Sequence, residues 1–304
     1  MSKSLPIYSI NSFKKELTRK EFYANNFSDH VKEHRFTNLP HKHDFFLVVL
    51  VTKGSGWHEV DFVRYAVKPG SVFTLQPGQM HFWNLSADVE GFVFFHTKSF
   101  YEEANNTLRI YDFPFFSSFQ SNKEFTVSIE KINKLIYWMT EIIEETRTIH
   151  SDSRLKIRTL IDLIYIELSR DFVHEKTTSQ YTYLSRLSEF EKLIEDNYKT
   201  NKSTQFYADK LHISGKHLNR IVKESVNKTS SELIADRIIL EAKRLLIQSK
   251  LNVSEIGYEL GYFDKSYFVR FFKKQTGETP LTFLERYKSD NSLLKKNGCF
   301  HTRS

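Results

Sequence analysis

The segment GYFDKSYFVRFFKKQTGETP, residues 261–280, is the most informative stretch of this chain. Asp264 precedes a run in which Phe268 and Phe272 stand four residues apart, and Gly277 follows that run. An aspartate before such a run is typical of a helix N-cap, and a glycine after it is typical of a C-cap. The segment therefore predicts a helix between Asp264 and Gly277.

A second helix is expected directly before this one. Residues 254–262, SEIGYELGY, have helical spacing, and Phe263 is expected in the turn between the two helices. Two helices joined by a short turn make a helix-turn-helix motif.

The same unit occurs once more in the preceding sequence, at an offset of 50 residues. Residues 218–220 correspond to residues 268–270, and Asn227 corresponds to Gly277. In this first copy residues 204–212 predict a helix, Ile213 lies in the turn, and Ser214 is an N-cap candidate. The chain therefore carries two copies of one motif.

A single long helix is expected between the two copies. Residues 230–248, SSELIADRIILEAKRLLIQ, carry apolar side chains at helical spacing. Nineteen residues at about 1.5 Å each span roughly 28 Å. Successive major grooves on one face of DNA recur about every 34 Å, so the two copies could enter adjacent grooves if the DNA bends slightly.

The charge of the chain is concentrated in the same region. The sequence has 44 Lys and Arg against 37 Asp and Glu, a net charge of +7 and a pI near 9.1. Residues 1–180 are neutral overall, so the whole excess falls within residues 181–304. A basic C-terminal part predicts a polyanionic partner.

Other broad classes are disfavoured by the composition. The longest apolar run, residues 45–51, is far shorter than the ~18 residues of a membrane helix, and the N-terminus lacks a signal-peptide core. Cys299 is the single cysteine, so an internal disulfide is impossible. We expect a cytoplasmic protein that has no membrane partner.

The N-terminal part has a different texture. Short apolar runs at residues 45–51, 57–62, 71–75 and 89–96 are separated by glycine and proline turns, which indicates a β-sandwich or small barrel. Residues 128–172 then have helical periodicity with a break at 151–153, which predicts an antiparallel helical hairpin. This hairpin either caps the β domain or contacts a second subunit.

These patterns predict an α+β fold with two domains. The N-terminal one is a β-barrel with a helical hairpin, and the C-terminal one is all-α, with two helix-turn-helix motifs joined by a long helix. The predicted segments are a β domain at 1–127, the hairpin at 128–173, a linker at 174–185, the DNA-binding domain at 186–288 and a disordered tail at 289–304; the resemblance described below implies that the β domain is a sensor.

The outward faces of the second helices carry the residues expected to contact DNA. Arginine suits guanine, asparagine suits adenine, lysine neutralises phosphate, and a valine suits the methyl group of thymine. A solvated helix face is the alternative for any one of these side chains. The candidates are Lys216, His217, Asn219, Arg220, Lys223, Lys265, Ser266, Tyr267, Val269, Arg270 and Lys273.

Residues 261–280 closely resemble the signature of AraC/XylS-type transcription regulators, and residues 186–287 resemble their two-motif DNA-binding domain. The resemblance implies base-reading roles for Asn219, Arg220 and Arg270. It also implies promoter DNA, a small-molecule effector and RNA polymerase as partners, and a homodimer. Three positions depart from the family pattern, namely His212 in place of a turn glycine, Val269 in place of a polar residue and Leu284 in place of an arginine.

Residues 40–84 resemble the cupin-like sensor domain of the same family. In metal-binding cupins two histidines of a first motif, a nearby glutamate and a histidine of a second motif hold a metal. The matching histidines here are His41, His43 and His81, but Leu47 stands where the glutamate is expected. We therefore predict no cofactor and no metal, unless Asp44 or Glu59 completes a metal site.

An effector pocket is the preferred use of this region, because small barrels often bind small molecules. The alternative is that these side chains are core. The candidates are His41, His43, Phe46, Trp57, Phe73, His81 and Trp83.

The leading hypothesis is a DNA-binding transcription regulator that responds to an effector, and not an enzyme. One alternative is a metal-dependent cupin enzyme that uses the three histidines. Another is a DNA-binding regulator whose N-terminal domain only dimerises.

Overall fold

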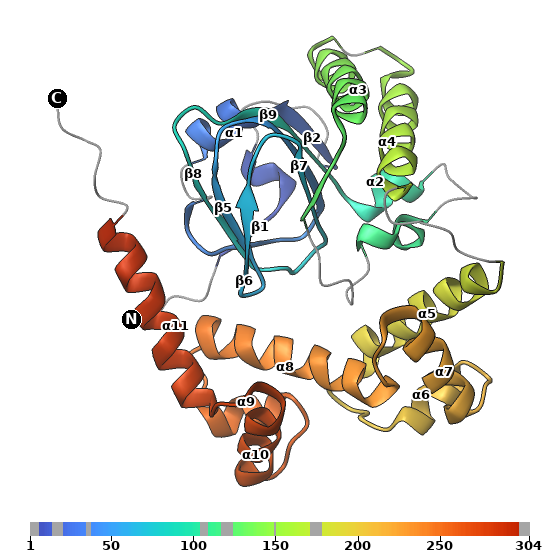
Figure 1. Cartoon of the computed structure of the whole chain (residues 1–304), viewed down its shortest axis with the longest axis vertical. Helices are drawn as coiled ribbons and strands as arrows, with labels where there is room; N and C mark the ends of the chain where they lie inside the picture. Colours follow the sequence, from blue (N-terminus) through green and yellow to red (C-terminus); the bar gives the residue numbers. More distant parts are fainter. Residues whose placement is uncertain are drawn as a thin grey trace. The chain divides into compact units, whose positions relative to one another are not determined.

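A computed structural model describes residues 6–13, 21–34, 38–103, 109–116, 124–148, 150–170 and 178–297 (Figure 1). The chain divides into two compact units, one of residues 5–188 and one of residues 189–304. The first unit is rich in strands and the second is helical in its described part. The predicted α+β class is confirmed.

Two antiparallel sheets form the centre of the first unit. The larger has the order β10-β7-β4-β9-β2 and the smaller the order β6-β5-β8. Among the described strands these sheets do not join into one closed ring, so the predicted barrel is a looser pair of sheets. The strands are β2 (Phe22–Asn26), β4 (Phe46–Lys53), β5 (Gly56–Val60), β6 (Val63–Val67), β7 (Ser71–Leu75), β8 (His81–Leu85), β9 (Glu90–His96) and β10 (Glu124–Thr126).

Shorter elements surround the sheets. A two-residue parallel pair joins β1 (Ile7–Tyr8) to β3 (Lys42–His43). Helix α1 (Phe27–Glu33) contacts β9 and β2. The remaining short helices are η1 (Ile10–Phe13), α2 (Lys98–Glu102), η3 (Ile110–Asp112) and η4 (Pro114–Phe116).

Strand β4 separates two hydrophobic cores, because successive strand residues point to opposite faces of a sheet. Phe46, Val48 and Leu50 belong to one core, whereas the alternate residues Leu47 and Val49 belong to the other. All are buried. Both faces of β4 are therefore buried, and residues 46–51 of this strand are all apolar.

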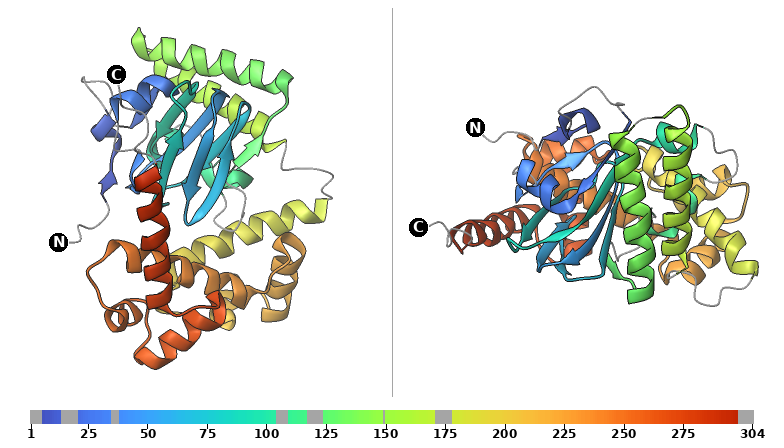
Figure 2. Two further views of the ribbon diagram at one scale, coloured as in Figure 1. Left: turned by 60° about the vertical axis from the view of Figure 1, so that its left-hand side comes forward. Right: turned by 90° about the horizontal axis from the view of Figure 1, so that it is seen from above.

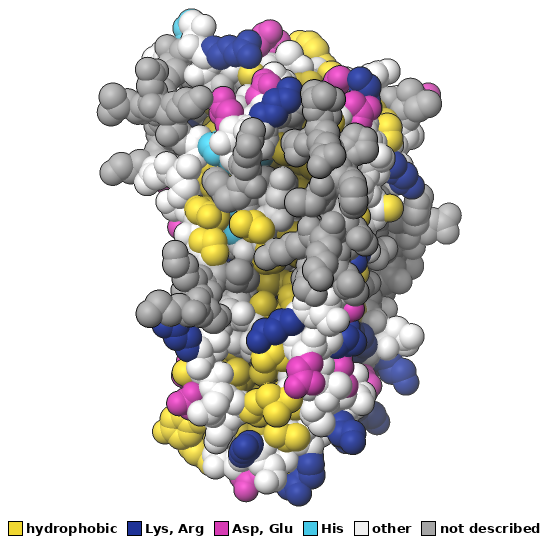
Figure 3. Space-filling model, turned by 90° about the vertical axis from the view of Figure 1, so that its left-hand side faces the viewer, with side chains coloured by type: hydrophobic (Ala, Val, Ile, Leu, Met, Phe, Trp, Pro, Cys, Tyr) yellow, Lys and Arg dark blue, Asp and Glu magenta, His cyan; other side chains and the backbone are white. Residues whose placement is uncertain are grey.

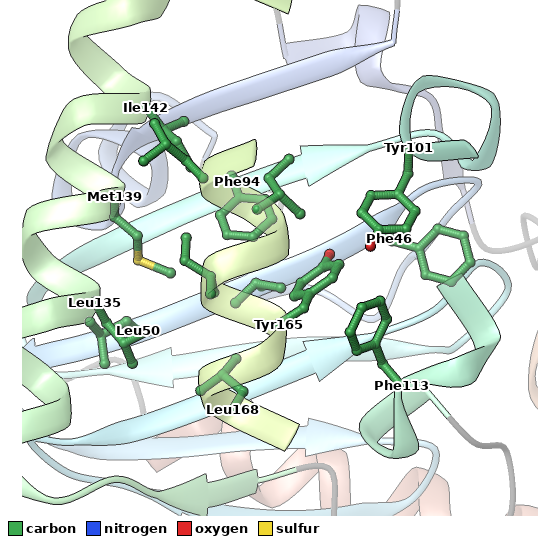
Figure 4. Close-up of a cluster of buried hydrophobic side chains, with 14 of the residues drawn as sticks. Phe46, Leu50, Phe94, Tyr101, Phe113, Leu135, Met139, Ile142, Tyr165 and Leu168 are labelled. Carbon is green, nitrogen blue, oxygen red and sulfur yellow. The ribbon is translucent and has the colours of Figure 1, made fainter. Parts of the chain in front are cut away.

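The helical hairpin covers one face of the larger sheet. Helices α3 (Ile129–Arg147) and α4 (Ser153–Ser169) pack together and contribute Leu135, Met139 and Tyr165 to the core that contains Phe46 (Figures 2 and 4). The Tyr165 hydroxyl lies 2.5 Å from Nε2 of His96, and both side chains are buried. The predicted hairpin and its break are thus present.

One predicted strand is shorter than expected. Residues 57–62 were predicted as one strand, but β5 ends at Val60, and Asp61 and Phe62 both have positive φ, 47° and 73°. Two such residues between paired strands are typical of a type I′ hairpin turn. The Asp61 carboxylate accepts hydrogen bonds from the Met80 amide and the Gln79 side chain. These two hydrogen bonds stabilise the turn, although phenylalanine is not a typical turn residue.

The second unit contains the two predicted motifs (Figure 1). Ser214 caps the second helix of the first motif by accepting from the His217 amide, and Asp264 caps its counterpart by accepting from the Tyr267 amide. Asn227 and Gly277 end these helices with φ of 54° and 83°. The helices are α5 (Thr178–Asn197), α6 (Thr204–Lys210), α7 (Gly215–Val226), α8 (Ser230–Gln248), α9 (Val253–Glu259), α10 (Lys265–Thr276) and α11 (Pro280–Asn297).

Helix α8 has the predicted bounds and is tied to the elements on both sides. Its N-terminus carries a capping box between Thr229 and Glu232. Near the middle of α8, the buried Arg237 donates to both carboxylate oxygens of Glu195 on α5, at 2.5 and 2.8 Å, and its guanidinium stacks over the Tyr198 ring at 4.0 Å.

The ends of the second unit differ from the prediction. Helix α5 begins at Thr178, so the predicted linker is helical from that residue on, while residues 174–177 lie outside the described part. Helix α11 continues to Asn297, whereas residues 289–304 were predicted to be disordered. Phe283 and Tyr287 are buried and anchor this helix, and Cys299 lies outside the described residues. Among the described helices, none is long and apolar enough to span a membrane.

Gly261 offers a test of how firmly the turn of the second motif is held. It has a φ of 75°, and a Cβ there would lie 2.0 Å from the Lys199 carbonyl oxygen. Gly277 also has a positive φ, but a Cβ there would meet nothing within 4 Å. We expect Gly277→Ala to lower the free energy of unfolding by about 1–2 kcal/mol, the cost of a left-handed alanine.

Gly261→Ala should cost at least about twice as much, because it adds a backbone clash to the same conformational cost. Urea unfolding followed by helical circular dichroism measures both variants. Equal losses in the two variants would show that the contact with Lys199 does not constrain this turn.

Candidate functional site

The strands of the first unit bring four buried histidines together. The ring centroids of His41 and His81 lie 4.3 Å apart, and those of His43 and His81 lie 4.9 Å apart. Nε2 of His58, on β5, lies 3.0 Å from Nδ1 of His81, on β8. The backbones of His41 and His81 also form a bridge. The sequence predicted three members of this cluster.

Hydrogen bonds define the protonation of two of these rings. Nδ1 of His41 donates to the Leu39 carbonyl at 2.8 Å, and Nδ1 of His43 donates to the Phe45 carbonyl at 3.0 Å. A carbonyl oxygen can only accept, so in the neutral ring the proton is on Nδ1 and Nε2 carries a lone pair.

The cluster is neutral near pH 7. Burial lowers the pKa of His41 to about 4, and burial together with His41 lowers the pKa of His43 to about 3. Burial, followed by the charges of neighbouring histidines, also holds the pKa values of His58 and His81 well below the ordinary range. The site therefore presents neutral imidazoles in an apolar surrounding.

His41, His43 and His81 border a small cavity of about 10 Å³, which is room for about one water molecule. Within the described residues, Nε2 of His43, Nε2 of His81 and Nδ1 of His58 have no hydrogen-bond partner. This volume is far below that of ordinary ligand pockets, so a ligand larger than water would enter only if the walls moved apart. The cavity is lined by Phe13, Phe27, His30, His41, His43, Phe45, Leu47, Val49, His81, Trp83, Val93 and Phe95.

Three residues expected in the pocket lie elsewhere. Phe46 points to the other face of β4, into the core beneath the hairpin. Trp57 packs against Phe82 and under the Arg64 guanidinium, 4.7 Å from the ring centroid. Phe73 is buried behind the cavity, between His58 and Trp83. The alternation of each strand, rather than aromatic content, decides which side chains reach the cavity.

Two histidines near the cavity were missed from the sequence. His58 lies two residues before the buried Val60, so strand alternation places it inward and could have revealed it. His30 lies on α1, where its ring contacts Phe13 and Phe95, and burial lowers its pKa to about 3. No strand motif points to His30.

A metal centre is not formed by the side chains that the structure describes. Among these residues, no group of three or more His, Cys, Asp or Glu side chains is arranged to hold a metal ion. Leu47, which stands in place of the cupin glutamate, is an apolar wall of the cavity. Glu59 instead pairs with Arg64 at 2.7 Å.

The second candidate site is the outward surface of α7 and α10. On α7, Lys216, Arg220 and Lys223 are exposed, and His217 is half-buried. The exposed Asn219 is not free to act alone, because its Oδ1 accepts from the Ser230 amide at 2.9 Å. A bidentate pair with adenine uses the same oxygen, so in the predicted role Asn219 would accept a second hydrogen bond there or give up the one from Ser230.

Helix α10 presents the corresponding set in the second motif. Every predicted residue of this helix is exposed except Val269, which is half-buried. The exposed residues are Lys265, Ser266, Tyr267, Arg270 and Lys273. Both motifs thus display cationic side chains on the helix that follows the turn.

Comparison with known families matches both units. A profile described as a helix-turn-helix domain matches residues 207–286, and one described as an AraC-like ligand binding domain matches residues 27–148. The chain is an AraC-type transcription regulator.

Curated relatives of this AraC-type regulator extend over most of its length. An uncharacterized HTH-type transcriptional regulator, YfiF of Bacillus subtilis (strain 168), is 22% identical over 92% of this chain and 89% of its own. The HTH-type transcriptional activator RhaS of Pectobacterium carotovorum is 24% identical over 79% of this chain and 85% of its own. The family resemblance predicted from the sequence is confirmed.

Two solved structures are also similar to parts of this chain. Unsaturated fatty acid-bound ToxT from Vibrio cholerae is 15% identical, covers 88% of this regulator and 96% of its own chain, and has a TM-score of 0.41. The C-terminal domain of the response regulator yesN from Fusobacterium nucleatum is 25% identical and covers 31% of this regulator and 93% of its own chain, with a TM-score of 0.30.

The buried histidines predict that the sensor unit of this regulator is sensitive to acid. The folded-state pKa of His43 is about 3, below the ordinary value of 6.5. Between those values His43 is protonated in the unfolded chain and neutral in the folded chain. The free energy of unfolding therefore falls as the pH falls below about 6.5. Each such histidine contributes about 1.4 kcal/mol per pH unit in that window.

Replacing His43 with glutamine should reduce this dependence between pH about 6.5 and about 4, because one titrating group is lost. Intrinsic tryptophan fluorescence during urea unfolding is the measurement, since Trp57, Trp83 and Trp138 all lie in the first unit. An unchanged acid dependence in His43→Gln would mean that His43 is not held neutral in the folded protein.

Proposed function

We propose that this regulator reads promoter DNA with α7 and α10 and binds a small-molecule effector in the histidine cavity. The observation that carries the DNA assignment is the repeat itself. Each motif presents exposed lysine and arginine side chains on the helix that follows its turn. A single basic helix face is common on protein surfaces, whereas two equivalent faces on one chain are typical of a reader of double-stranded DNA.

The length of α8 supports this reading. Its nineteen residues, Ser230–Gln248, give a rod of roughly 28 Å between the motifs. Adjacent major grooves are about 34 Å apart, so moderate bending of the DNA would let α7 and α10 enter successive grooves.

Individual roles follow from the side-chain chemistry and from the contacts in the structure. Arg220 and Arg270 are the proposed readers of guanine, because arginine can pair with two acceptors of that base. Lys223 and Lys273 are the proposed phosphate contacts. Asn219 is assigned instead to holding the N-terminus of α8, since its Oδ1 accepts from Ser230.

Binding measurements on a selected DNA site test these assignments. We expect Arg220→Ala and Arg270→Ala each to weaken binding by about 1–3 kcal/mol and to relax the base preference at one position. Lys223→Ala should weaken binding to all sequences alike and make it less dependent on salt. Fluorescence anisotropy titrations at several salt concentrations separate the two behaviours. Unaltered affinity and preference in both arginine variants would refute the base-reading assignment.

The proposed effector site is the cavity bordered by His43 and His81. The lone pair on Nε2 of His43 is buried and lacks a partner among the described residues, so a hydroxyl or amide N–H of a ligand could donate to it. Aromatic walls supply apolar contact. An effector would act by binding one conformation of the regulator more tightly than another.

We propose that the hairpin also serves as a dimer contact. Its outer surface exposes Tyr137 on α3 and Leu155, Leu163 and Ile166 on α4. Apolar side chains grouped in this way often mark a protein interface. The proposal further includes RNA polymerase as a partner at the promoter and the cytoplasm as the location. No arrangement of the described residues favours the alternative of a metal-dependent enzyme.

A double substitution tests the dimer contact. Leu163→Glu combined with Ile166→Glu places two charges in the proposed interface, which should abolish dimers at micromolar concentration. Leu281→Glu, at an exposed position of the second unit, is the matched control and should leave the assembly unchanged. Sedimentation equilibrium reports the mass of each variant. Dimers that persist in the double variant would exclude this surface as the contact.

A further inference from the structure

The turn of the second motif has one residue more than the turn of the first. The Ile213 amide donates to the Ala208 carbonyl at 3.0 Å, and the Tyr262 amide makes the equivalent bond to Gly257 at 2.8 Å. The next helix is capped by Ser214 in the first motif, directly after Ile213, but by Asp264 in the second. Tyr262 therefore takes the place of Ile213, and Phe263 is the additional residue. The sequence prediction had placed Phe263 itself in that position.

Phe263 has no role in packing this motif. Its side chain is 90% exposed, which is exceptional for phenylalanine. A hydrophobic residue just before an N-cap usually packs against the fourth residue of the helix, here Phe268. Phe268 is fully buried and contacts Tyr262 instead, at a centroid distance of 5.4 Å. The usual structural reason for a phenylalanine at this position is therefore absent.

The backbone on both sides of Phe263 is held in place. The Gly261 carbonyl accepts from Lys202 at 3.1 Å, and the same ammonium group lies 4.6 Å from the centroid of the Tyr262 ring. Asp264 accepts from the Tyr267 amide at 2.6 Å. The ring of Phe263 also meets that of Tyr258, itself 69% exposed, in an edge contact at 6.0 Å. Phe263 and Tyr258 form an aromatic pair presented to solvent.

The charges around this aromatic pair indicate what it contacts. Helix α10 starts directly after Asp264 and exposes Lys265, Arg270 and Lys273. Hydrophobic side chains lie among Lys and Arg side chains, with some Asp and Glu, on the part of the second unit shown in Figure 3. An apolar surface bordered by cations complements a DNA groove, where apolar methyl groups lie between phosphates.

We propose that Phe263, supported by Tyr258, contacts thymine methyl groups at the edge of the site read by the second motif. The inference rests on the proposed function, because it requires α10 to enter the major groove. The N-terminal end of a recognition helix contacts base edges, and Phe263 stands just before that end. The thymine C5-methyl is the apolar group that the major groove offers. The first motif, which lacks the extra residue, has no such contact.

Uracil substitution provides the test. The full chain is first used to select its preferred site from random DNA, and each thymine of the α10 half-site is then replaced in turn by uracil. This change removes the methyl group and keeps the base pair. With the parent protein, one or two replacements should weaken binding about three- to tenfold. With Phe263→Ala, affinity for the thymine site should fall by a similar factor, and the same replacements should have no further effect.

Phe263→Ser is a second variant, and both should keep the melting temperature of the parent because the side chain is exposed. Phe263→Ala that binds as tightly as the parent, or that retains the full uracil penalty, overturns the proposal. A reduced affinity with no uracil penalty in the parent also overturns it, since the contact would then not be to a methyl group. Failure of the proposed function looks different, because the parent would then select no site.

Discussion

The DNA-binding unit depends on one helix, α8, whose length and side-chain contacts fix the distance between the two motifs. At its N-terminus the Asn219 side chain accepts from Ser230, which joins α7 to the rod. Near the middle, Arg237 donates to Glu195 on α5 and stacks over the ring of Tyr198, which directly follows α5. Toward the other end, α9, α10 and α11 all contact α8. The spacing of α7 and α10 is therefore set by one helix, α8, and by the side chains that anchor it.

Local signals explain why the second unit was predicted well. The bounds of α8, both N-caps and both left-handed C-caps follow from residues within four positions of each helix end. His212, which stands in place of a turn glycine, has a left-handed φ of 55°. The extra residue of the second turn was not visible in the sequence. The two copies were matched through their second helices, α7 and α10, which are offset by 50 residues, and that match does not show the length of the preceding turn. Only the hydrogen bonds of Ile213 and Tyr262 reveal it.

The histidine cavity was predicted in part, for a related reason. The resemblance to the cupin-like domain identified His41, His43 and His81, which lie at or beside the ends of short strands. Phe46, Trp57 and Phe73 lie outside the cavity lining. For Phe46 and Phe73, a strand that is buried on both faces does not say which alternate set faces the cavity. His30 reaches the cavity from a helix, so only the tertiary fold brings it there. The continuation of α11 beyond residue 288 was missed because its anchors, Phe283 and Tyr287, precede a polar segment that shows no clear period.

The two faces of β4 have a consequence for how such a sensor can diversify. Odd-numbered positions of β4, such as Leu47 and Val49, line the cavity. Even-numbered positions, such as Phe46 and Val48, belong to the core that packs against the hairpin. Substitutions at the odd set can alter ligand preference and leave the seat of the hairpin intact. A single inserted residue would exchange both sets at once. The strand therefore tolerates replacements on one face more readily than insertions, so the lining of the cavity and the packing of the hairpin can change independently.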